Sequence, residues 1–289
     1  MSIHRTLRRA ILAVAAVIPL ITYSTTYAAT LDEIKARGYM VVATEDDFAP
    51  FEFVKDGTGE GFDYDMLEDL RKYAPFKIRQ EVLPWTGILP GVTEGKYDAA
   101  ITGCSITTER MGSLSFTEPW ALATHYSITR AGAQNAKTLA QLSGLTVGVQ
   151  TGSAQLSRLP ELGQMLKKTG GSVGKIVQYP SYPEIYADLA NGRLDYVVNT
   201  LIGANSLVRE RPGVFQVGVQ VAGPGFYAYP VKKDNDSVLE FLNGFIEHQR
   251  KTGRLAELQK KWFGQAFDDM PSGVITTADQ VKRMTALPN

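Results

Sequence analysis

Two stretches, one in each half of the chain, follow the same pattern. Residues 94–102 read EGKYDAAIT, and residues 191–199 read NGRLDYVVN. In each, a glycine, a basic residue, one spacer and an aspartate precede a short apolar run, an order typical of a helix end, a glycine cap and a buried strand. Upstream of each lies a glycine-led apolar run, GYMVVAT at 38–44 and GLTVGVQ at 144–150. The repetition predicts an α/β protein with two lobes of similar plan.

The segments between these units alternate short apolar runs with helical patterns. A hairpin is predicted around Asp56 and Gly57, because an Asp-Gly pair between two β-rich runs favours a tight turn. We expect residues 126–130 and 226–231 to carry the chain between the lobes, and the last 20 or so residues to form either a short extra element or a frayed tail. The other expected elements are strands at 39–44 and 76–82, and helices at 65–73, 85–93 (with Pro90 inside) and within 234–263.

The N-terminal segment has a composition of its own. Residues 1–28 carry three arginines and no acidic residue, and the apolar run at 10–22 is thirteen residues long. That run is shorter than the roughly 20 residues that a transmembrane helix needs. A small-x-small site ending at Ala28, with Ala29 as second choice, predicts a cleaved secretory signal over residues 1–28; the alternative is an N-terminal membrane anchor. The expected product is a soluble protein exported to a Gram-negative periplasm, without a lipid anchor because no cysteine lies at the cleavage site.

Charge and cysteine content exclude several classes of function. The chain has 289 residues, with thirty basic and thirty acidic side chains, so it has no electrostatic footprint for nucleic acid. Without the three arginines of the signal, 27 basic residues face 30 acidic ones, a net charge of −3. The single cysteine, Cys104, excludes an internal disulfide and a cysteine-clustered metal site. We expect neither a cofactor nor a metal.

Candidate binding residues follow the predicted strands, because ligands of open α/β sheets bind beyond the carboxyl ends of the strands. These positions are 45–48, 102–105, 151–155 and 199–200. Backbone N–H groups near Ser105 and the planar fork of Arg110 suit a carboxylate, although Arg110 could instead be a solvent-facing helix residue. Thr151 to Gln155 (TGSAQ) has the same form in the second half. The acidic run from Glu45 to Asp47 is either a solvated loop or, in a cleft, a site for a cation.

No arrangement of residues predicts catalysis. The mature chain has two histidines, His125 and His248, and it lacks the G-x-S-x-G, H-E-x-x-H and P-loop motifs. Cys104 is expected to be a buried small residue, because strand alternation points it away from a ligand that Gly103 or Ser105 would face. We therefore expect no catalytic residue.

With these patterns in view, the chain resembles the family 3 periplasmic solute-binding proteins, the polar-amino-acid receptors of ABC importers. The resemblance covers roughly residues 31–265 and depends on an ordered set of motifs rather than on any one of them. The set comprises FAPF at 48–51, GFDYD at 61–65, Trp85 with Leu89-Pro90, GKYD at 95–98, SITTER at 105–110, FTEPW at 116–120, residues 147–155, GRLD at 192–195 and KWFG at 261–264.

The resemblance implies a two-lobed type II periplasmic-binding-protein fold with two hinge crossovers and a ligand in the interlobe cleft. Lobe 1 would be discontinuous, comprising residues 29–127 and 228–289, and lobe 2 would be residues 128–227. The implied function is capture of a small carboxylate-bearing solute, an amino acid or a derivative, by a monomer that delivers it to an ABC permease in the inner membrane. A sensory receptor for a small solute is an alternative that the sequence does not separate from transport.

The resemblance also implies roles for individual residues. Arg110 would hold the ligand carboxylate, and Phe48 and Trp85 would sandwich the ligand side chain. Glu45 would lie near the far end of the pocket. The full set of expected ligand-binding residues is Glu45, Phe48, Trp85, Thr102, Gly103, Ser105, Arg110, Ser153, Ala154, Gln155, Asn199 and Thr200.

Two positions depart from patterns known in related proteins. Amino-acid binders of the family place an aspartate for the ligand ammonium five residues after the aspartate of G-R-x-D, and here that position is Thr200. Because a buried ammonium without a carboxylate partner is costly, either Glu45 or Asp46 takes the role or the ligand lacks an α-ammonium.

The second departure concerns an alternative function, a periplasmic cyclohexadienyl dehydratase on the same fold. The general acid of those enzymes corresponds to Gln155 here, which cannot supply a proton in that way.

Overall fold

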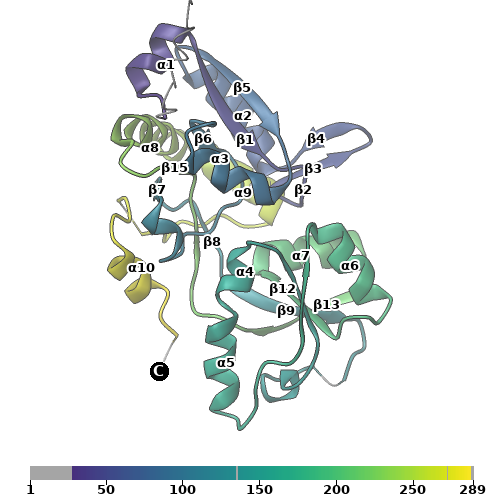
Figure 1. Ribbon diagram of the computed structural model, residues 1–289. Helices are drawn as coiled ribbons and strands as arrows, with labels where there is room; N and C mark the ends of the chain where they lie inside the picture. The colour runs from purple at the N-terminus through teal and green to yellow at the C-terminus, as the bar shows by residue number, and fades with distance from the viewer. Residues whose placement is uncertain (1–27, 135, 272, 288–289) are drawn as a thin grey trace, which may run out of the picture.

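Two bodies joined by extended segments make up the chain (Figure 1). The computed structural model describes residues 28–134, 136–271 and 273–287. The predicted signal peptide, residues 1–28, therefore lies outside the described residues except for Ala28. Within the described ranges, no helix combines the length and the apolar character that crossing a bilayer requires.

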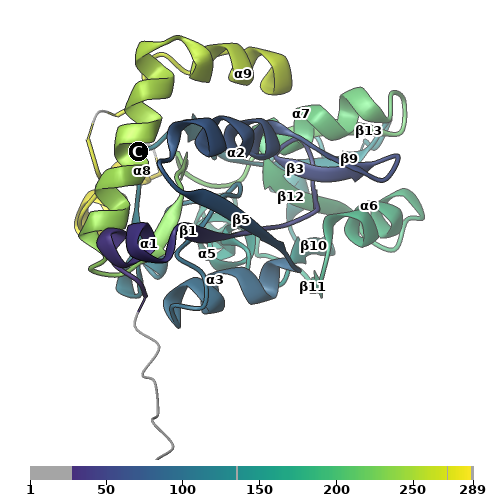
Figure 2. The same ribbon diagram turned by 90° about the horizontal axis from the view of Figure 1, so that it is seen from above.

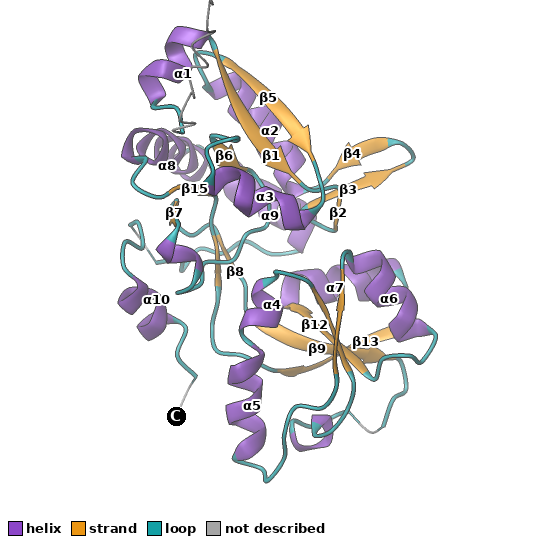
Figure 3. Cartoon of the chain, viewed as in Figure 1, coloured by secondary structure: helices purple, strands orange, loops and turns teal. Residues whose placement is uncertain are grey.

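The first body is built on a five-stranded sheet with the order β5-β1-β6-β15-β7 (Figure 3). β1 pairs in parallel with β5 and β6, while β15 runs antiparallel to β6 and β7. The bounds of these strands are β1 (Tyr39–Thr44), β5 (Lys77–Val82), β6 (Ala99–Ala100), β7 (Leu114–Phe116) and β15 (Pro230–Lys232). Its helices are α1 (Leu31–Arg37), α2 (Phe62–Tyr73), α3 (Trp85–Thr93), η1 (Arg110–Gly112), α8 (Asp236–Lys251) and α9 (Arg254–Phe263).

A three-stranded meander extends from this body. It consists of β2 (Asp47–Phe48), β3 (Glu52–Lys55) and β4 (Thr58–Glu60). The turn between β3 and β4 has positive φ at Asp56 and Gly57 (51° and 78°), which is the backbone form that an Asp-Gly hairpin turn requires. The hairpin predicted from the sequence is thus present.

The second body has a five-stranded sheet with the order β11-β10-β12-β9-β13. β10 lies parallel to β11 and β12, and β9 runs antiparallel to β12 and β13. The strands are β9 (His125–Arg130), β10 (Val147–Gln150), β11 (Ile176–Tyr179), β12 (Tyr196–Thr200) and β13 (Phe215–Gln220). The helices are η2 (Ala140–Leu142), α4 (Ala154–Ser157), α5 (Leu159–Lys167), α6 (Tyr182–Ala190) and α7 (Leu201–Glu210).

The two repeated units occupy equivalent places in the two sheets. Each glycine-led strand, β1 or β10, pairs in parallel with the strand of its repeat, β6 or β12. The repeated aspartate has the same contact in both bodies: Asp98 Oδ2 accepts a hydrogen bond from Val41 N at 2.7 Å, and Asp195 Oδ2 accepts one from Thr146 N at 2.7 Å. The aspartate therefore satisfies a backbone N–H near the start of the neighbouring strand, which explains its fixed place in the pattern.

One expected crossover lies elsewhere. Residues 126–130 form most of β9, an internal strand of the second sheet. Their backbone pairs with β12 on one side and with β13 on the other. The chain passes between the bodies just before this strand, where β8 (Ala121–Leu122) pairs with β14 (Phe226–Tyr227) and Ala123 N donates to Gly225 O at 2.7 Å. The predicted second crossover, residues 226–231, contains β14 and the start of β15. The residue limits of the two lobes stay predictions.

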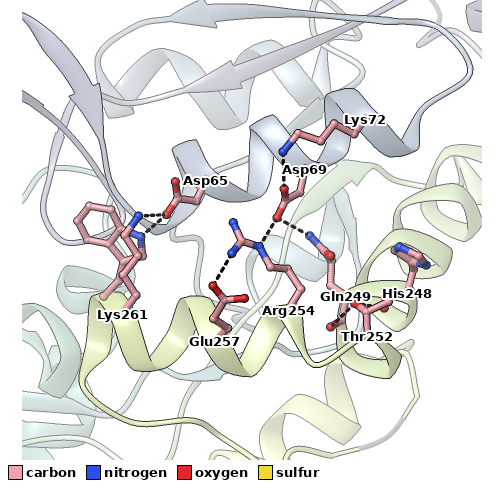
Figure 4. A network of polar contacts seen from close by, with 10 residues as sticks. Asp65, Asp69, Lys72, His248, Gln249, Thr252, Arg254, Glu257 and Lys261 are labelled. Carbon is pink, nitrogen blue, oxygen red and sulfur yellow. Dashed lines mark hydrogen bonds and ion pairs between the residues drawn. The ribbon is translucent and has the colours of Figure 1, made fainter.

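Helices α8 and α9 lie against α2 and complete the first body (Figure 2). Asp69 of α2 accepts hydrogen bonds from Lys72 Nζ (3.1 Å), Gln249 Nε2 (3.1 Å) and Arg254 Nε (2.8 Å), as Figure 4 shows. Burial opposes ionisation of this carboxyl, but these donors outweigh it and lower the pKa of Asp69. The long C-terminal helices are thus held by a charged network as well as by apolar packing.

The C-terminal segment forms an ordered element rather than a frayed tail. Helix α10 (Ala278–Met284) begins with a capping box between Thr277 and Gln280. Ile275 and Val281 are buried in an apolar cluster of the first body that includes Phe116. This burial explains why a polar stretch with little helical pattern is nevertheless structured.

Candidate functional site

A cavity between the two bodies collects most of the residues that the sequence indicated. Nine of the twelve predicted residues line it, and Gln150 and Tyr182 complete the wall. The first body contributes Glu45, Phe48, Trp85, Gly103, Ser105 and Arg110, and the second contributes Gln150, Ser153, Ala154, Gln155 and Tyr182. Their ligand-binding roles stay predictions.

Arg110 joins the two bodies at this cavity. Its Nη1 donates to Ser105 O at 2.8 Å, and its Nη2 donates to Gly152 O of the second body at 3.2 Å. The guanidinium carbon lies 5.1 Å from the centroid of the Trp85 ring, a cation–π distance. Among the described residues, Arg110 has no ion-pair partner. A half-buried cation held by backbone carbonyls and an aromatic face is available to an anion, and the planar fork favours a carboxylate.

Glu45 provides the acidic group of the cavity. Its side chain is buried, and Oε1 accepts a hydrogen bond from Gln150 Nε2 at 2.8 Å. The carboxyl is also hydrogen-bonded to that of Asp47, and no other donor of the described residues reaches Oε2. Burial, and to a smaller extent the neighbouring Asp47, raises the pKa of Glu45 well above its usual value. The carboxyl is therefore poised to ionise when a cationic group enters and pairs with it.

Phe48 makes two aromatic contacts at the cavity, one with the second body and one within the first. Phe48 stacks on Tyr182 of the second body, with ring centroids 5.1 Å apart and planes at 15°. Phe48 also stacks on Phe51 at 4.8 Å. A Cβ at Gly103 would lie 2.8 Å from the Phe48 ring, so the close approach of this strand end requires glycine.

Three predicted residues lie behind the cavity wall rather than on it: Thr102, Asn199 and Thr200. The Thr102 hydroxyl donates to Glu52, and the Thr200 hydroxyl caps α7 by accepting from Gly203 N at 3.3 Å. Asn199 Oδ1 accepts from Gln155 Nε2 at 3.3 Å. These side chains satisfy buried polar groups of the fold, so they support the lining residues from behind.

Tyr182 and Gln150 are the lining residues that sequence reasoning missed. Gln150 is the last residue of β10, and Tyr182 begins α6 just after β11 ends at Tyr179. Both therefore obey the rule that ligands bind beyond the carboxyl ends of strands. The strand at 176–179 was not predicted from the sequence. Had it been, the same rule would have pointed to Tyr182.

Cys104 is fully buried, as predicted, and burial raises the pKa of its thiol. Gln155 is buried as well and donates to Asn199 Oδ1, so at this position the cavity holds an amide and no acid. Neither residue offers a group suited to nucleophilic or general-acid chemistry.

Comparison with known proteins gives a consistent result. Residues 40–265 match the family model described as bacterial extracellular solute-binding proteins, family 3. A "probable histidine-binding protein" of Neisseria gonorrhoeae is 28% identical over 227 residues, which cover 78% of this chain and 82% of that protein. A mutant of ArgBP from T. maritima has a TM-score of 0.70 and 30% identity, covering 81% of this chain and 99% of that one. An ancestral amino-acid-binding protein described as a precursor of cyclohexadienyl dehydratase has a TM-score of 0.72 and 28% identity, covering 81% and 100%.

The two solved structures share the architecture described above, and the relatives found by sequence are named as binding proteins. The chain is accordingly a solute-binding protein and not an enzyme. Because the family model spans both bodies and the segments that join them, this protein belongs to the bacterial extracellular solute-binding proteins, family 3.

Proposed function

We propose that this protein is the periplasmic substrate-binding component of an ABC importer and captures a small carboxylate-bearing solute, an amino acid or an amino-acid derivative, by closure of its lobes. The observation that carries the proposal is Arg110, a cation with no ion-pair partner in the described chain that faces the cavity and contacts both bodies. An inner-membrane permease would receive the solute from the closed protein.

The solute carboxylate would bind the guanidinium of Arg110, assisted by the backbone at Gly103 and Ser105. A cationic or hydrogen-bond-donating group of the solute would face the carboxyl of Glu45, which lines the cavity beside that of Asp47. This arrangement places opposite charges at two separate points of the wall. It favours a dipolar solute over a simple carboxylic acid, because only a solute with a cationic group gains an ion pair with Glu45 when that carboxyl ionises.

Closure follows from the distribution of these groups over both bodies. A solute bound to Arg110 and Glu45 also meets Ser153, Ala154 and Gln155 of the second body only when the lobes are together. Solute binding therefore shifts the population toward the closed form by the free energy of those additional contacts.

A thermal-shift screen over amino acids, opines, amides and organic acids tests the proposal. A solute present at about a hundred times its Kd stabilises the folded protein by about 2.7 kcal/mol, which raises the melting temperature by several degrees. We expect hits among dipolar carboxylates, confirmed by isothermal titration calorimetry. A screen in which no carboxylate-bearing solute raises the melting temperature would contradict the proposal.

Thr200 predicts how the protein treats an α-ammonium. Its hydroxyl accepts hydrogen bonds from Tyr227 OH (3.0 Å) and Gly203 N, so it offers no negative charge. The variant Thr200→Asp keeps a helix-capping oxygen but adds a carboxylate next to Asn199, whose Oδ1 accepts from Gln155 of the cavity wall. We expect it to raise affinity for free α-amino acids relative to their N-acetyl or deamino analogues by about tenfold, measured by calorimetry. Thr200→Ser is the matched control, and equal selectivity in both variants would show that this position does not discriminate.

A further inference from the structure

Tyr182 lies at the boundary between two interlobe cavities. This residue lines the cavity described above and also a second interlobe cavity of about 280 Å³, and we take its side chain as the partition between them. On the proposal that the protein captures dipolar carboxylates, we infer that Tyr182 is a specificity-determining residue that limits the length of the solute.

Several contacts support this role for Tyr182. The ring is 2% exposed and stacks on Phe48 of the opposite body, so it stands across the space between the bodies. Its hydroxyl is buried without a hydrogen-bond partner among the described residues. The carboxyls of Glu45 and Asp47 are hydrogen-bonded to each other, so before a solute binds one shared proton bridges them. A buried hydroxyl without a partner, on a cavity that Glu45 also lines, indicates a place where a polar group of the solute is received, since such an atom is costly to leave unsatisfied.

The main cavity is small in this arrangement, because its accessible volume of about 10 Å³ is that of roughly one water molecule. A solute of amino-acid size therefore binds only when the Arg110–Gly152 and Phe48–Tyr182 contacts separate to admit it. The carboxylate end is fixed by Arg110. The length that fits depends on how far the Tyr182 ring stands from that point.

The second cavity would suit a cation if the partition were removed. Its lining includes Asp46, Asp47 and Glu210, against the single basic side chain of Arg211. A solute with a long cationic arm would place its charge among these carboxylates, but the Tyr182 ring blocks the path. The partition thus favours short dipolar carboxylates, whose cation stops at Glu45 and the Tyr182 hydroxyl.

A homologous series of linear amino carboxylates tests the inference: β-alanine, γ-aminobutyrate, δ-aminovalerate and ε-aminocaproate, with L-ornithine and L-lysine in parallel. For the wild-type protein we expect calorimetric affinity to peak at a short member and to fall about tenfold or more toward the longest, as one misplaced methylene costs at least that much. Tyr182→Ala joins the cavities, and it is expected to move the optimum to a longer member and to raise affinity for ε-aminocaproate about tenfold.

Tyr182→Phe is the matched control, because it keeps the ring and removes the hydroxyl. It should retain the wild-type length optimum while weakening every member of the series. The inference is overturned if Tyr182→Ala keeps the wild-type rank order, or if no member binds either protein. If either result is found while other dipolar carboxylates still bind in the thermal-shift screen, the Tyr182 inference fails but the proposed solute-binding function stands. The screen therefore distinguishes failure of the inference from failure of the proposed function.

Discussion

Replacement of Arg110 by alanine is expected to weaken binding of the solute identified by screening about a thousandfold while the protein stays folded. The guanidinium is the cation that faces the cavity wall shared by both bodies, and the solute carboxylate would be desolvated against it. Removing one partner of a desolvated charge pair costs about 4 kcal/mol, which corresponds to a Kd about a thousand times larger. Titration calorimetry measures the Kd directly.

The fold should tolerate this change, because Arg110 lies at a boundary rather than in a core. Its side chain donates to two carbonyls and to Cys104 Sγ and lies over the Trp85 ring. Arg110→Lys keeps the charge but loses the two-point geometry, and its affinity should lie between those of the wild type and the alanine variant. Arg79→Ala, which removes an exposed cation over Tyr39 away from the cavity, is the control and should bind normally. An unchanged Kd in Arg110→Ala would remove the carboxylate role from this residue.

The architecture could be predicted because its signals are local and repeated. The glycine–basic–x–aspartate pattern indicates a helix end followed by a strand. The structure shows why aspartate stands there, because Asp98 and Asp195 each accept a hydrogen bond from a backbone N–H in or just before the adjacent strand. The hairpin at Asp56 and the helix containing Pro90 could likewise be predicted from residues that are close together in the sequence. Such features depend on a few neighbouring residues, so the sequence alone is enough to find them.

Features that depend on pairing between distant segments were harder to predict. The composition of residues 126–130 fits either a connecting segment or a strand. They form a strand because their backbone pairs with β12 and β13, which are distant in the sequence. Tyr182 reaches the cavity because α6 begins against β2 of the other body, a contact that no local pattern announces. Thr102 and Thr200 follow strands as the cavity residues do, yet their hydroxyls turn to Glu52 and to the start of α7.

A second large effect is expected from a buried acid pair below the cavity. Glu52 and Asp63 are fully buried side chains of the first body. Glu52 accepts a hydrogen bond from Thr102, whose neighbour Gly103 lines the cavity, and Asp63 Oδ1 accepts one from Tyr229 OH at 2.6 Å. Burial, together with the closeness of the other carboxyl, raises the pKa of Glu52 well above its usual value. Burial raises the pKa of Asp63 to about 6.

These raised pKa values give stability a definite pH dependence. The unfolded chain releases the Asp63 proton near pH 3.8, whereas the folded chain holds it until about pH 6. The contribution to stability is therefore complete below pH 3.8 and is lost as the pH rises to about 6. That interval corresponds to a loss of about 3 kcal/mol from Asp63, and Glu52 adds a loss of the same sign at higher pH.

Glu52→Gln should therefore stabilise the protein at neutral pH, by about 2 kcal/mol at pH 7.5. The amide keeps an oxygen that accepts from Thr102 and adds an N–H that can donate to Asp63, as the protonated acid does, without a proton to lose. Urea unfolding between pH 4 and pH 8 measures the effect, and the gain over wild type should vanish toward pH 4. Glu68→Gln, at an exposed carboxyl on α2, is the control and should follow the wild-type curve. Parallel curves for Glu52→Gln and wild type would mean that Glu52 is not protonated in the folded protein.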